Sequence, residues 1–118
     1  MIGLDRLIEK PGVIAAGQFD DNGDIKRAVG ELSDEAKKIF AQLAKENEDI
    51  FEKECELLSE KVDSQWKPYA GWAMWSGKYA LCMVGKTGVV VEIGKADFNQ
   101  LMIDLIDENP TGPKPRNY

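Results

Sequence analysis

The sequence predicts an α/β fold of the α+β kind, in which a five-stranded antiparallel sheet lies between one long helix and two short helices. Three observations predict it. The elements follow in the order α-β-β-α-β-β-β-α, three strand-like runs are apolar at nearly every position, and about 30 consecutive residues contain nothing that ends a helix. A chain of 118 residues, 43% of them hydrophobic, can bury a core around such a sheet.

The chain begins with a short helix and a β-hairpin. Leucine and isoleucine recur at helical spacing over residues 4–8, and Pro11-Gly12 ends that helix. Residues 13–19 are expected to form the first strand, the Asp-Asn-Gly-Asp turn at 21–24 to close the hairpin, and residues 25–31 to form the return strand. The return strand carries adjacent basic residues, which suits a sheet edge because charge discourages unwanted pairing there.

The long helix is expected to begin after Ser33, a good N-cap, and to continue to about Asp63. Two acidic residues in its first turn interact favourably with the helix dipole. Its apolar residues form a stripe at helical spacing, made of Phe40, Leu43, Ile50 and Leu57 and broadened by Ile39, Phe51, Leu58 and Val62. Asn47 and Glu54 interrupt that stripe.

The second half of the chain predicts three strands and a final helix. The strand-like runs are residues 70–76, 78–85 and 88–93, and the short turns between them predict an antiparallel meander. Asp97 is the expected N-cap of the last helix, with Gln100 three residues later as in a capping box.

The apolar strands of the hairpin and the meander are expected to pair, which places the five strands in the order 2-1-5-4-3. Strands without hydrophobic alternation are covered on both faces, so the long helix is expected on one face and the two short helices on the other. This domain is expected to span residues 1–108. Residues 109–118 are Pro-rich and polar, and they are expected to form a flexible C-terminal tail.

Two features predict a homodimer. The strand at 70–76 would form an edge without any charged residue, which is an aggregation hazard unless something pairs with it. A helix of about 30 residues spans ~45 Å, whereas a compact domain of this length is about 35 Å across. Either the helix bends, or part of its apolar stripe lies against a second chain. A two-fold dimer joined through this edge and this helix would account for both features. The candidate dimer interface consists of Trp72, Met74, Trp75, Ile50, Phe51, Leu57 and Leu58.

Tyr69, Glu48, Glu52 and Glu56 are the candidate partner surface. The acidic face of the long helix suits a basic partner, although such a face is more often simply solvated. Trp72 and Trp75 differ in register and cannot both lie on one side of a regular strand. One of them is expected in the core, and the other on an interface, where Trp and Tyr dominate binding energies.

The composition excludes several functions. A net charge of −6 opposes binding to nucleic acid phosphates or to an anionic membrane. The N-terminus lacks the pattern of a signal peptide, and no apolar run is long enough to span a bilayer, so a cytoplasmic location is expected. The chain has no histidine, the commonest general base and metal ligand. We therefore expect no catalytic residues, no metal and no cofactor.

Three weaker motifs have structural interpretations that we prefer. Gly85-Lys86-Thr87 resembles the end of a phosphate-binding loop, but a strand and not a helix is expected after it. Acidic residues over 20–31 have calcium-loop spacing, but Ile25 occupies the position that requires glycine. Cys55 and Cys82 lie in no Cys-x-x-Cys motif and are expected to be small buried residues.

Several motifs resemble the roadblock (dynein light chain) family, which is related to the longin and profilin folds. The first half contains Leu4-x-x-Leu7-Ile8-x-x-Pro11-Gly12-Val13 and then Asn22-Gly23. The second half, which resembles an uncharacterised prokaryotic branch, contains Trp66-x-Pro68-x-x-Gly71, Cys82-x-Val84-Gly85, Gly88-Val89-x-Val91-Glu92 and Lys95-Ala96-Asp97-Phe98-Asn99. The resemblance implies a roadblock/profilin-like fold and a dimer that scaffolds motors or regulates a small GTPase or other partner, without an active site.

The sequence thus favours a non-catalytic homodimeric interaction or scaffold module. Two alternatives remain. One is a module that binds a small ligand, or senses it, in a cavity between the sheet and the short helices. The other is an enzyme that uses carboxylates or a thiol.

Overall fold

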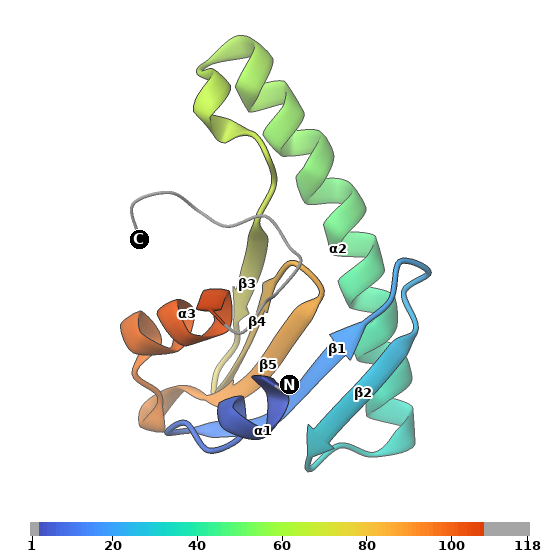
Figure 1. The fold of residues 1–118 in the computed structure, drawn as a ribbon, viewed down its shortest axis with the longest axis vertical. Coiled ribbons are helices and arrows are strands. Elements are labelled where there is room, and N and C mark those ends of the chain that lie inside the picture. Colours follow the sequence, from blue (N-terminus) through green and yellow to red (C-terminus); the bar gives the residue numbers. More distant parts are fainter. Residues whose placement is uncertain (1–2, 108–118) are drawn as a thin grey trace.

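The computed structural model describes residues 3–107. Its five strands form one antiparallel sheet in the order β2-β1-β5-β4-β3, which confirms the predicted fold class and strand order (Figure 1). The strands are β1 (Val13–Phe19), β2 (Ile25–Gly30), β3 (Gly71–Trp75), β4 (Tyr79–Val84) and β5 (Thr87–Glu92). The α-helices are α1 (Gly3–Leu7), α2 (Asp34–Lys61) and α3 (Phe98–Asp107), with short 3-10 helices at Ser64–Trp66 and Ile93–Lys95. The predicted tail at 109–118 lies outside the described residues.

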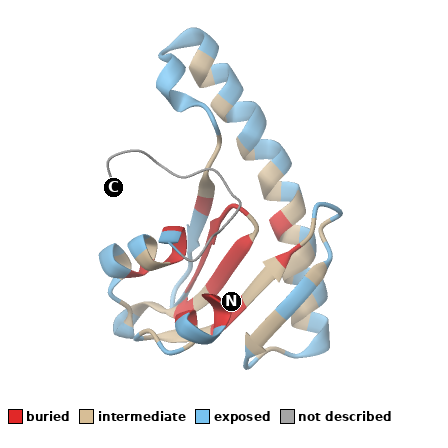
Figure 2. Cartoon of the chain, viewed as in Figure 1, coloured by how far each residue is buried: buried red, intermediate tan, exposed pale blue. Residues whose placement is uncertain are grey.

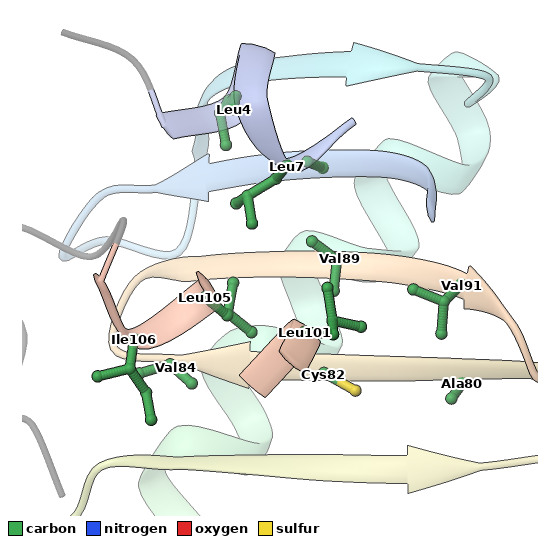
Figure 3. Packing of buried hydrophobic residues seen from close by; sticks show 11 residues of the cluster. Leu4, Leu7, Ala80, Cys82, Val84, Val89, Val91, Leu101, Leu105 and Ile106 are labelled. Atoms are coloured by element: carbon green, nitrogen blue, oxygen red, sulfur yellow. The ribbon is translucent and has the colours of Figure 1, made fainter. Parts of the chain in front are cut away.

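The short helices α1 and α3 cover one face of the sheet. Their leucines Leu4, Leu7 and Leu105 are fully or almost fully buried against the central strands, as Figure 3 shows for this cluster. The strands contribute Val89 and Val91 from β5, together with small residues from β1 and β4. This face contains the main core. The strands that contribute to it, β1, β4 and β5, are those whose sequences are apolar at nearly every position.

The long helix α2 covers the other face. The Ser33 side chain caps it by accepting a hydrogen bond from the Ala36 N–H at 3.1 Å, as predicted. Phe40, Ala44 and Phe51 pack toward Trp72 and the strands beneath them. Only Ala44 among the 28 residues of this helix is buried, and the second half of the helix extends past the end of the sheet (Figures 1 and 2).

The predicted apolar stripe of α2 is therefore divided between two sides of the helix. Phe40 and Phe51 face the sheet, whereas Ile50 and Leu57 are exposed. The longest dimension of the described chain is 41 Å, close to the ~42 Å that 28 helical residues span. The helix thus runs the full length of the molecule, farther than its own sheet can cover.

Asp97 caps α3 by accepting a hydrogen bond from the Gln100 N–H at 3.2 Å, as predicted. The Gln100 side chain donates to Asp104, so this amide reaches forward along the helix and not back to the cap. Among the described residues, no helix is both long and apolar enough to cross a membrane.

Candidate functional site

The outer edge of β3 is the most exposed apolar part of the sheet. Ala73, Met74 and Trp75 are all exposed at the end of the strand order. Met74 lies opposite Leu81 and Trp75 opposite Ala80. Because successive side chains of a strand alternate between faces, Met74 belongs to the face that α2 covers and Trp75 to the face of α3.

The two tryptophans divide as the sequence predicted. Trp72 is buried, and its ring stacks on Phe51 with centroids 6.3 Å apart. Trp75 is 54% exposed, and its ring lies 4.9 Å from that of Phe98. Trp72 therefore supports the edge from within its own chain, and Trp75 is the one of these two that another molecule can contact.

An apolar flank of α2 accompanies this edge. Ile39, Ile50 and Leu57 are each about half exposed, and the helical period places them on one side of the helix together with the partly exposed Leu43. We call these four residues the α2 flank. The opposite side of α2 faces the β1–β2 hairpin, since Lys45 lies beside Gly23. The α2 flank is therefore turned away from β2, toward the β3 side of the sheet.

The acidic residues of the candidate partner surface differ in environment. The Glu48 carboxylate is only 14% exposed and accepts hydrogen bonds from Lys86 Nζ at 2.7 and 2.8 Å. Glu48 therefore makes an intramolecular contact between α2 and the β4–β5 turn. Glu52 and Glu56 are exposed, so they are the carboxylates of this set that a partner can reach.

Tyr69 lies under α2, partly buried against Trp72 and its neighbours. Burial raises the pKa of its hydroxyl well above the ordinary value, and the negative charges of Glu48 and Glu52 raise it further. The tyrosine is therefore neutral at physiological pH, and it contributes packing between the helix and the start of β3.

Sequence reasoning missed the Lys86–Glu48 pair and the side of α2 that packs on the sheet. The available signal was Ala41 and Ala44, small residues that allow close approach, followed by Glu48 at the same helical spacing. A charged side chain on the side of a helix that faces the sheet is costly to bury unless it has a partner of opposite charge. For Glu48 this partner is Lys86 in the β4–β5 turn.

The two turn motifs and Cys82 have the predicted structural interpretations, whereas Cys55 is less buried than predicted. Gly85-Lys86 forms the turn between β4 and β5, and a strand follows it. The Asp20 carboxylate accepts hydrogen bonds from the N–H groups of Asn22 and Asp24, both at 2.9 Å, and so stabilises the hairpin turn. Cys82 is fully buried, and burial raises the pKa of its thiol to about 11, which keeps it protonated at neutral pH. Cys55 is only partly buried.

The ligand-binding alternative predicted a cavity on the side of the short helices. An apolar cavity lies on the opposite face, between the sheet and α2, where Phe19, Phe40 and Leu81 contribute to its lining. Its volume is about 20 Å³, enough for about one water molecule. It is too small for a metabolite.

The solved structures that are similar to this chain include the following two. The crystal structure of a Roadblock/LC7 domain from Streptomyces avermitilis matches with a TM-score of 0.67 and 13% identity, covering 87% of this chain and 85% of that chain. The gliding protein MglB from Thermus thermophilus matches with a TM-score of 0.70 and 14% identity, covering 86% of this chain and 76% of that chain. The chain therefore has the roadblock fold, as its motifs predicted.

No curated protein matches the chain in sequence. A family match covers residues 3–107, which include every described helix and strand. The chain belongs to the family described as "Uncharacterized conserved protein (DUF2173)".

Proposed function

We propose that the protein is a non-catalytic homodimeric interaction module, whose two copies meet through the edge of β3 and the α2 flank. The observation that carries the proposal is that both surfaces are apolar, exposed and turned to the same side of the sheet. Strand pairing at β3 would satisfy the unpaired backbone groups of that edge. A two-fold axis beside β3 would bring the two α2 flanks together in the same contact.

The distribution of charged residues over the two edge strands supports an interface at β3 and not at β2. The edge strand β3 contains no charged residue, whereas β2 carries Lys26 and Arg27. Two copies of β3 can therefore pair in any register without bringing like charges together, whereas two copies of β2 would bring four basic side chains to one edge. Met74 on one face and Trp75 on the other would then extend the contact beyond the backbone.

The roadblock fold supports a regulatory or scaffold role for this dimer. The roadblock resemblance implies a small GTPase as one class of partner, and the exposed Glu52 and Glu56 suit a basic surface on such a protein. Both carboxylates lie in the second half of α2 and are exposed, so a partner can reach them without displacing the core.

The dimer is tested by absolute molar mass in solution, measured by light scattering over a concentration series. The wild-type protein is expected at twice 13.2 kDa. Met74→Lys places a charge on the α2 face of the proposed interface without touching the core, because Met74 is 47% exposed. This variant is expected to be a folded monomer.

The matched control is Ile103→Lys, which charges an exposed apolar residue on α3, on the face of the sheet opposite to α2. It is expected to remain a dimer. A monomeric wild-type protein, or a Met74→Lys variant that dimerises as well as the control, would contradict the proposed interface.

A further inference from the structure

The opposite edge of the sheet, β2, also has unpaired backbone groups within the described residues. Across the end of the β1–β2 pair, the Glu31 N–H donates to the Ile14 carbonyl at 3.2 Å. Alternate residues of an antiparallel pair exchange both of their hydrogen bonds. In this register Arg27 and Val29 therefore direct their backbone groups toward β1, and Ala28 directs its N–H and C=O away from the sheet.

An open groove lies between this edge and the first turns of α2. Its volume is about 520 Å³, within the range of protein binding sites. One wall is the start of β2 and the turn before it, and the other is the side of α2 that faces away from the α2 flank. The residues that line the groove are Gly23, Asp24, Ile25, Lys37, Lys38, Ala41 and Gln42. An extended chain beside β2 would lie under this part of α2.

The groove differs in charge from the molecule as a whole. The chain has a net charge of −6, whereas α2 contributes Lys37 and Lys38 to the groove and β2 carries Lys26 beside it. Within residues 3–107, neither Lys26 nor Lys38 has an ion-pair partner.

Carboxylates also lie in this part of the molecule, and the groove-lining Gln42 donates a hydrogen bond to one of them, Glu46, at 3.2 Å. Asp34 is 98% exposed and 3.9 Å from the Lys37 ammonium, a distance at which a solvated pair contributes little. Asp5 pairs with Arg27 on the α1 face at 3.2 Å. Asp24 lines the groove at the hairpin turn. The α2 wall of the groove is therefore its basic side.

The basic residues of β2 and α2 indicate which kind of strand can bind in the groove. A second copy of β2 would bring the Lys26 and Arg27 side chains of both chains close together along one edge, which is unfavourable. A strand that carries carboxylates would instead face Lys37 and Lys38 with opposite charge, while its backbone pairs with Ala28. We propose that the groove between β2 and α2 binds an extended acidic segment of a partner protein by strand addition to β2. The proposal does not depend on the dimer, because β2 and β3 are opposite edges of the sheet.

The test uses a labelled, end-capped peptide of alternating valine and glutamate, with a valine–lysine peptide as its counterpart. Binding to the full chain is measured by fluorescence anisotropy at low and high salt, and the site is located from the backbone amide shifts in NMR spectra. The acidic peptide is expected to bind, more weakly at high salt, and to shift the amides of β2. The basic peptide is expected not to bind.

Two variants probe the charge and the backbone separately. The double variant Lys37→Glu/Lys38→Glu is expected to weaken binding about tenfold or more. Ala28→Pro removes the outward N–H of an edge strand, where proline is tolerated, and is also expected to weaken binding. The matched control Lys53→Glu/Lys61→Glu makes the same charge change on the second half of α2 and is expected to bind as the wild type does.

The proposal is overturned if the acidic peptide does not bind, if its amide shifts lie at β3, or if the Lys37 and Lys38 reversals bind as well as the control. NMR spectra of each variant show whether it is folded. If Ala28→Pro does not fold, the lysine reversals on the exposed helix surface decide the outcome.

Discussion

Gly30, the last residue of β2, has a φ of +98°, in the left-handed region that favours glycine. A Cβ at this position would also meet the carbonyl oxygen of Ile14 and the Cα of Ala15. These backbone atoms belong to or adjoin the central strand β1 and cannot move independently of the sheet. Glycine is therefore required here both for conformation and for the close approach of β2 to β1.

Gly30→Ala is expected to lower the free energy of unfolding by about 2 kcal/mol or more, because strain and backbone overlap add together. Urea unfolding followed by circular dichroism measures this change. Gly77→Ala is the matched control, since an added Cβ at Gly77 meets nothing within 4 Å, and its effect is expected to stay within about 0.5 kcal/mol. Equal stabilities for the two variants would show that the described conformation of Gly30 is wrong.

The tryptophans illustrate how much a single residue reveals before the fold is known. Their separation of three residues places Trp72 and Trp75 on opposite faces of any regular strand. It does not say which face is better covered. The structure decides this because α2 crosses one face near Trp72 and places Phe51 on its ring. Trp75 lies at the edge, where its ring contacts Phe98 of α3 and remains 54% exposed.

At the scale of elements, α2 is held to the sheet by apolar contacts and by one charged contact. The Lys86–Glu48 pair joins the middle of the helix to the β4–β5 turn at 2.7 Å, with Glu48 only 14% exposed. Asp21 adds a weaker contact to the same ammonium at 3.9 Å. Farther along the helix, Phe51 stacks on Trp72, so the ion pair and this aromatic contact together hold the middle of α2 to the sheet.

A double-mutant cycle of Glu48→Gln and Lys86→Met is expected to show a coupling energy of about 1–2 kcal/mol, because the pair is charged, hydrogen-bonded and partly desolvated. Chemical unfolding of the wild type, both single variants and the double variant measures it. Lys45 and Asp49, an exposed pair on the same helix at 3.5 Å, serve as the control cycle and are expected to couple by less than about 0.5 kcal/mol. A coupling no larger than that of the control would mean that Lys86 does not hold the helix.

At the scale of the whole molecule, the proposed dimer predicts that stability depends on protein concentration. If unfolding separates the two chains, each tenfold rise in concentration stabilises the folded dimer by about 1.4 kcal/mol. The midpoint of thermal unfolding is therefore expected to rise with concentration for the wild type and to stay constant for Met74→Lys. Calorimetry over a wide concentration range measures both, and a constant wild-type midpoint would be the behaviour of a monomer.

The sequence by itself determined which elements form and how the strands are ordered. Ser33, the Asn22-Gly23 turn and the unalternating apolar strands are local signals, and the structure has the cap, the hairpin and the central strands where these signals predict them. Such signals are readable because capping, turn conformation and side-chain alternation depend on residues a few positions apart.

Only the tertiary structure decided how α2 is rotated over the sheet, and therefore which residues form the candidate surfaces. An apolar stripe as broad as the one from Ile39 to Val62 fits the sheet in more than one rotation. The rotation that forms is set by the sum of many contacts, including the small residues Ala41 and Ala44 and the Lys86–Glu48 pair. The same rotation leaves the α2 flank exposed and opens the lysine-lined groove beside β2. The groove joins two separate segments of the chain, so no local pattern predicts it.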